Sequence, residues 1–227
     1  PEWRAVRSLP QRNVLHRHTV DRHMVETAVQ AAALTRQVHR PDILLFSALF
    51  HDIGKGTGED HSDRGERLIE PLAKRIGFSG EDVETIKLLV KHHLLLSATA
   101  TRRDLDDPAT IASVVEVIPN LQALELLHAL SIADGEATGR AAWTDWKASL
   151  VAELVKRVAL AITDNTVALQ PELTADQRVK ADSGALAVSI EDRDSVYAIE
   201  IVVPDKTGLL SIVAGVLNLL RLDVRSA

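Results

Sequence analysis

The chain contains 227 residues with a formal net charge of −6 and no cysteine, which excludes disulfides and thiolate-ligated metal sites. The acidic balance argues against a nucleic-acid partner, because nucleic-acid binders need a basic surface. No apolar run has the length of a membrane span and no signal-peptide pattern is present, so we expect a cytoplasmic protein with no membrane partner.

Helical periodicity dominates the first 162 residues. After an irregular basic stretch over 1–18, helices are expected over 19–39, 43–55, 65–76, 79–93, 108–119, 121–137 and 141–162. Two starts carry clear signals: Ser79 opens a capping-box-like sequence, and Asp107 stands directly before a proline. Polar or glycine-rich stretches over 56–65 and 94–107 are expected to be loops.

The last part of the chain changes character. We expect a polar linker over 163–184, strands over 185–190 and 197–203, a loop over 204–208 and a helix over 209–222. The sequence therefore predicts a mainly α fold, with a helical domain over 1–162 and a truncated α/β domain over 185–227. Because the final five residues resemble a strand that has only begun, we expect the chain to be a piece of a longer protein.

Residues 43–55 form an apolar run of helical length that ends in three polar groups. At a period of 3.6, His51, Asp52 and Lys55 lie along one side. Burying these groups is costly unless something compensates them, and a metal ion beside a bound phosphate would do so. The alternative is a solvated helix end followed by Gly54, which is the better interpretation if the His-Asp pair is taken alone.

Other polar groups also fall on apolar helical faces, namely His23, His92, His93 and Asp134. Any one of them alone is more often a hydrogen-bonded core residue than a metal ligand. Several helices that each carry a histidine or aspartate inward favour a metal site, because helical bundles build such sites from facing helices. The nitrogen and oxygen donors are compatible with manganese, magnesium, iron, cobalt or zinc.

The order of these residues resembles the HD-domain metallophosphohydrolase superfamily, whose signature is His…His-Asp…Asp. The resemblance implies four core metal ligands, which are His23, His51, Asp52 and Asp134. For members that hold two metals it implies further ligands at His61, His92 and His93. We therefore expect two divalent ions, and the resemblance favours manganese or magnesium.

Several segments are similar to the central part of the bacterial bifunctional PII uridylyltransferase/uridylyl-removing enzymes. They are 19–23, 51–56, 60–62, 93–97, 102–108, 133–134 and 143–147. Residues 204–210 resemble the loop that opens the first helix of an ACT domain, with Thr207 where proline is frequent. That likeness implies a ferredoxin-like fold for the tail and an amino-acid site at Asp205, Gly208 and Leu209.

In that family the HD domain removes a nucleotide from a tyrosine of the PII signalling protein, and ACT domains sense glutamine. This chain has no nucleotidyltransferase motif, so the resemblance implies only the removing activity, for uridylyl or adenylyl groups. Catalytic roles are expected for Asp52, Lys55 and His61, with Lys55 holding a phosphate oxygen. Arg102 and Arg103 either contact the substrate or form a solvated basic loop balanced by neighbouring acids.

Two other functions stay open. One is an HD phosphodiesterase that acts on a free or cyclic nucleotide, and the other is a non-catalytic module that transmits an amino-acid signal. The remaining histidines are interpreted without a function: His16 and His18 at the surface, His39 at a helix C-terminus, and His128 in the core or behind a ligand.

Overall fold

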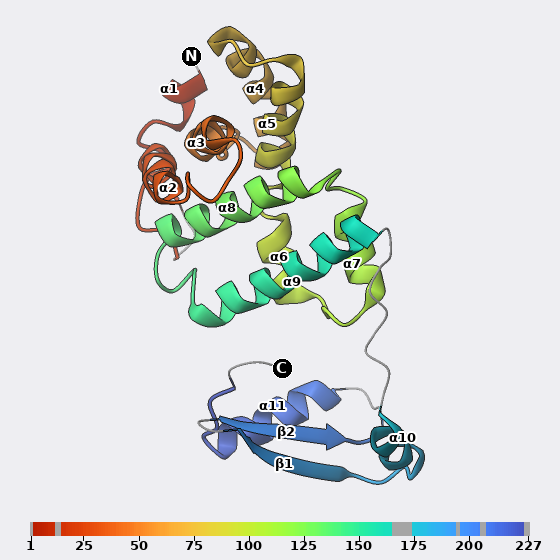
Figure 1. Cartoon of the computed structure of the whole chain (residues 1–227). Coiled ribbons are helices and arrows are strands. Elements are labelled where there is room, and N and C mark those ends of the chain that lie inside the picture. The colour runs from red at the N-terminus through yellow and green to blue at the C-terminus, as the bar shows by residue number, and fades with distance from the viewer. Residues whose placement is uncertain (1, 12–14, 165–173, 194–195, 205–207, 225–227) are drawn as a thin grey trace. The chain divides into compact units, whose positions relative to one another are not determined.

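The computed structural model describes residues 2–11, 15–164, 174–193, 196–204 and 208–224. The chain divides into two compact units, Pro1–Ala168 and Leu169–Ala227 (Figure 1). Among the described residues no helix is long and apolar enough to span a membrane. The prediction of a mainly α fold followed by a small α/β segment is confirmed.

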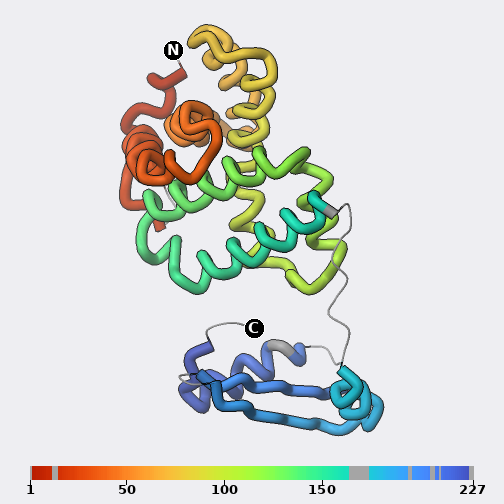
Figure 2. The backbone as a smooth tube through the Cα atoms, in the orientation of Figure 1, coloured from red at the N-terminus to blue at the C-terminus, as the bar shows by residue number. Residues whose placement is uncertain are grey.

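The first unit is helical throughout. Its helices are α1 Glu2–Val6, α2 Val20–Ala33, α3 Pro41–Phe50, α4 His61–Ile76, α5 Gly80–His92, α6 Leu95–Arg102, α7 Pro108–Val115, α8 Leu121–Thr138 and α9 Asp145–Asp164. Figure 2 traces the same path as a tube, with the chain running back and forth through the bundle.

The helix ends follow from local side-chain chemistry. The Ser79 side chain accepts a hydrogen bond from the Asp82 amide while Asp82 accepts one from the Ser79 amide, so the predicted capping box opens α5. Asp60 caps α4 by accepting from the amides of Ser62 and Asp63, which starts that helix earlier than position 65. Gly77 then ends α4 with φ of 105°, a left-handed conformation that favours glycine.

Helix α8 is the central element of the first unit. It packs against α2, α3, α5, α6 and α9, and its Leu124, Leu127 and Leu130 are buried in the main core (Figure 1). A smaller apolar cluster joins Val6 of α1 to Val20 and Met24 of α2 and to Ile53. This second cluster fixes the turn that follows α3 against the start of α2.

Three expectations about the chain are corrected. Residues 94–107 are not all loop, because Leu96 and Ala100 lie one turn apart on α6 and are buried in the main core, where α6 packs against α8 and α9. The start of the chain contains α1, whose Val6 is fully buried. The expected linker contains helix α10, Ala175–Asp182, because Thr174 and Gln177 form a capping box.

The helix expected over 43–55 is shorter than predicted. It ends at Phe50, and His51 to Gly54 form a tight turn in which the Ile53 amide donates to the Phe50 carbonyl. An added Cβ on Gly54 would lie 2.0 Å from the His61 carbonyl oxygen, so only glycine permits this approach of the turn to α4. The helix expected over 19–39 likewise ends early, at Ala33.

The second unit contains a β-hairpin and two helices. Strand β1, Ala187–Arg193, pairs antiparallel with β2, Val196–Val202, with Ile190 opposite Ile199. Glu200 accepts hydrogen bonds from Gln177, Lys180 and Ser189, which attaches α10 to the hairpin. Helix α11 covers Leu209–Leu219, and residues 194–195 between the two strands lie outside the described residues.

Candidate metal centre

Five segments of the first unit bring polar side chains to one place. His23 comes from the first turn of α2, the pair His51–Asp52 from the turn after α3, and Asp134 from α8. His61 is the first residue of α4, and His93 directly follows α5. The side chains of His23, His51, His93 and Asp52 are almost fully buried.

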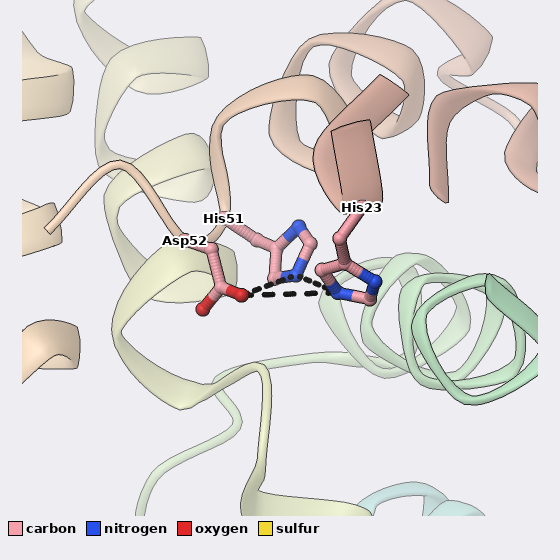
Figure 3. A group of neighbouring side chains, drawn as sticks. All are labelled: His23, His51 and Asp52. Atoms are coloured by element: carbon pink, nitrogen blue, oxygen red, sulfur yellow. Dashed lines mark hydrogen bonds and ion pairs between the residues drawn. The ribbon is translucent and has the colours of Figure 1, made fainter. Parts of the chain in front are cut away.

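The first group consists of His23, His51, Asp52 and Asp134. The His23 Nε2 lies 3.3 Å from the His51 Nε2 and 2.9 Å from the Asp134 Oδ1. The Asp52 Oδ2 lies 3.5 Å from the His51 Nε2 and 3.7 Å from the His23 Nε2. Figure 3 shows His23, His51 and Asp52 turned toward one another, with their polar atoms close enough to share one ion.

The second group uses the other oxygen of the same carboxylate. The Asp52 Oδ1 lies 3.7 Å from the His61 Nε2 and 3.7 Å from the His93 Nε2. This oxygen is buried, and within the described part of the chain it has no hydrogen-bond partner. A buried carboxylate oxygen without a partner is costly, and a cation between it and the two imidazoles would remove that cost.

Backbone carbonyls orient two of the imidazoles. The Nδ1 of His51 lies 2.9 Å from the Ala48 carbonyl oxygen, and the Nδ1 of His93 lies 2.7 Å from the Val90 carbonyl oxygen. In each ring Nδ1–H donates to the carbonyl, which makes Nε2 the nitrogen that can bind a metal once it is deprotonated. The donor set and its backbone support therefore fit two divalent ions that share Asp52.

The pKa values reflect the close packing of charges. Burial alone would lower the pKa of His51, but the carboxylates of Asp52 and Asp134 raise it to about 10. Burial would raise the pKa of both carboxyls, yet His51 and the surrounding cationic groups hold both well below their usual range. Burial, reinforced by His51, lowers the pKa of His93 to about 4, so this ring is neutral at neutral pH.

A proton must leave His51 before its Nε2 can bind a metal. Because the pKa of His51 lies near 10 in the metal-free protein, the ring keeps its proton at neutral pH, and metal binding releases it. We expect Mn²⁺ affinity at the first group to rise roughly tenfold per pH unit up to about pH 10. Calorimetry in buffers of different ionisation enthalpy should detect about one released proton. Affinity that does not change with pH would contradict this protonation state.

Lys55 and a cavity complete the centre. The Lys55 Nζ lies 2.6 Å from the Asp52 Oδ2 and donates to the Gln11 side-chain oxygen, also at 2.6 Å. A cavity of about 690 Å³ opens here, and Asp52, Lys55 and His61 are among its lining residues. Its volume lies within the range of small-molecule sites.

Not all predicted site residues lie at this centre. His92 belongs to neither group of neighbouring ligand atoms, because consecutive helical residues point about 100° apart and His93 takes the inward direction. Arg102 and Arg103 are exposed at the end of α6. Gly208, with φ of 80°, and Leu209 open α11, whereas Asp205 lies outside the described residues.

Two residues that line the cavity were missed by the sequence interpretation. His16 was expected at the surface, and Gln11 fell in a stretch predicted to be irregular; both line the cavity beside Asp52. Neither lies on a helix, so periodicity could not have placed them. Of the other histidines, His39 pairs with Glu125, with the His39 Nδ1 2.6 Å from the carboxylate, and His128 is partly buried.

The second group can be tested separately from the first. His61→Ala removes one of its three donors and leaves the four side chains of the first group in place. We expect one of two manganese ions to bind at least about 100-fold more weakly. Losing a residue that only hydrogen-bonds to a ligand already lowers metal affinity by about 10- to 100-fold, and His61 is itself a ligand of this group. Metal analysis after dialysis measures the stoichiometry. His39→Ala, at an exposed histidine, is the matched control, and equal metal content in the two variants would contradict the assignment.

Comparisons with known proteins agree with this geometry. A family model described as "HD domain" matches residues 20–135. The whole chain is 51% identical over 231 residues to the bifunctional uridylyltransferase/uridylyl-removing enzyme of Mycobacterium tuberculosis, covering 28% of that protein. It is 44% identical over 272 residues to the enzyme of the same name from Streptomyces coelicolor, again over the whole chain and covering 32% of that protein. The chain thus spans about a third or less of the length of these curated relatives.

Proposed function

Because this chain belongs to the HD-domain family, we propose that its first unit hydrolyses the phosphodiester bond between a nucleotide and a tyrosine of a PII-type signalling protein. The observation that supports this most strongly is the shared carboxylate of Asp52, whose two oxygens face two separate groups of histidines. The name of the relatives, which includes uridylyl removal, supports the choice of reaction.

Two divalent ions would be held by this chain. One ion would be held by His23, His51, Asp52 and Asp134. The other ion would be held by Asp52, His61 and His93. Manganese and magnesium are our preferred ions, since the donor set lacks thiolate and the family resemblance favours them. When bound, such ions supply a hydroxide nucleophile at neutral pH and neutralise charge on the phosphoryl oxygens.

The side chains around the ions account for the rest of the reaction. Lys55 lies at the cavity wall, where its ammonium can exchange contact with Asp52 for contact with a phosphate oxygen. The leaving group would be a tyrosine phenolate, whose conjugate acid has a pKa of about 10. This phenolate leaves without a strong general acid, so the chain does not need a dedicated proton donor. Arg102 ends α6 and Arg103 follows it, and these two exposed residues are proposed to contact the nucleotide or the partner's acidic surface.

The second unit is proposed to belong to an ACT domain that senses glutamine in the longer protein. In this proposal the domains are 1–162 for the hydrolase and 185–227 for the partial regulatory domain, and the connecting residues 163–184 include α10. Gly208 is the N-cap of α11 and Leu209 is its first residue, and the β-hairpin precedes this helix in the chain. This order is compatible with the start of such a domain. A cytoplasmic location is proposed with it.

A direct assay tests the proposed reaction. The chain, loaded with Mn²⁺, is incubated with uridylylated PII, adenylylated PII, free nucleotides and cyclic nucleotides, and the released nucleoside monophosphate is measured. We expect release from a modified PII and none from the free or cyclic nucleotides. Hydrolysis of only the free or cyclic nucleotides would support the other phosphodiesterase function. If none of these substrates reacts and His51→Ala keeps full signalling activity, the regulatory module would be the correct interpretation.

A further inference from the structure

We propose that His16 binds a phosphoryl oxygen of the substrate through its Nε2. His16 would thus be a substrate-contacting residue outside both groups of metal ligands. The inference deepens the proposed function and rests on it, because it assumes that the cavity at Asp52 receives a phosphate ester. The inference concerns binding of the phosphate group, whereas the proposed function concerns its hydrolysis.

His16 lies in the segment before α2 and lines the same cavity as Asp52, Lys55 and Asp134. Its ring contacts the ring of His23 edge-on, with centroids 5.3 Å apart and planes at 77°. His16 therefore stands beside the first group of ligands without belonging to it. A phosphoryl group positioned at these ligands would lie within reach of the His16 ring.

The two ring nitrogens of His16 differ in their surroundings. Nδ1 is sealed from solvent and has no hydrogen-bond partner within the described residues. Because Nδ1 is buried, Nε2 is the ring nitrogen that we assign to a ligand in the cavity. An unpaired buried nitrogen is costly, which indicates that the position of this ring is maintained for something other than packing.

The ring is suited to donating one directional hydrogen bond. An imidazole ring carries at least one N–H donor, and a charged phosphoryl oxygen is the strongest acceptor that this cavity would receive. Lys55 supplies a point charge to such an anion, whereas His16 adds a fixed direction.

The test is the affinity of the Mn²⁺-loaded chain for uridine 5′-monophosphate, measured by calorimetry in the wild type and four variants. His16→Ala removes the donor, and we expect affinity to fall about 10-fold, the usual effect of losing one hydrogen bond to a charged group. His16→Gln places an N–H near the position of Nε2 and should recover most of the affinity. His16→Asn is shorter and places its amide near Nδ1, so it should not. His18→Ala, two residues away and not lining the cavity, is the matched control.

The outcomes separate this inference from the function on which it rests. Unchanged affinity in His16→Ala, or no binding of the monophosphate by the wild type, would overturn it. So would loss of manganese from His16→Ala, because His16 would then be a metal ligand. If the His16 variants bind the monophosphate as expected but the wild type hydrolyses no modified PII, the proposed reaction fails while the phosphate contact stands. A merely structural role would lower affinity equally in the glutamine and asparagine variants.

Discussion

Asp52→Asn is expected to lower the rate of hydrolysis on the order of 1,000-fold or more and to reduce binding of both metal ions. The amide has the size of the carboxylate but no charge, so packing is preserved while the shared ligand is lost. In the wild type the two oxygens of Asp52 face different groups. Oδ2 faces His23 and His51, and Oδ1 faces His61 and His93. No other described residue takes part in both groups.

The measurement combines metal content with the rate of nucleotide release. Asp145→Asn is the matched control, since it is the same substitution at an exposed residue in the first turn of α9. Circular dichroism should show that both variants keep their helices. An Asp52→Asn protein that retains both ions or most of its activity would show that Asp52 is not the bridging ligand.

Gly54→Ala is expected to destabilise the first unit by about 3 kcal/mol or more, because overpacking against rigid backbone has costs of this size. A Cβ at this position would lie 2.0 Å from the His61 carbonyl oxygen and 2.6 Å from the Gly65 nitrogen. Both are backbone atoms of α4, so the helix itself would have to move. Since His61 is the first residue of α4, the displacement would also disturb the second group of ligands.

Gly58→Ala is the control for this substitution. Gly58 has no atom within 4 Å of an added Cβ and does not have a positive φ, so we expect a change within about 0.5 kcal/mol. Urea unfolding of the three proteins measures the difference in the free energy of unfolding. Equal stability of Gly54→Ala and Gly58→Ala would contradict the close approach of the turn to α4.

Local signals predicted many of the helices, and tertiary contacts explain most of the errors. The capping box at Ser79 and the Asp107–Pro108 start are encoded within a few residues, so α5 and α7 begin where the sequence indicates. Helix α6 was missed because its stability comes from burial of Leu96 and Ala100 by distant elements. The early end of α3 was missed because it depends on how closely Gly54 approaches α4.

The candidate site shows the same division. Periodicity placed His23 and Asp134 on inward faces, and the structure brings their side chains to 2.9 Å from each other. The sequence spacing did not show whether His92 or His93 is the ligand, because this depends on which side of α5 faces the bundle. His16 could not be found at all, since its place at the cavity comes from a segment without regular structure.

Anomalous diffraction from crystals of the chain grown with Mn²⁺ tests the central claim most directly. Two peaks are predicted, one on each side of the Asp52 carboxylate: the first between His23 and Asp134, and the second between His61 and His93. The absence of any peak beside Asp52, with these side chains in the arrangement described, would contradict the account.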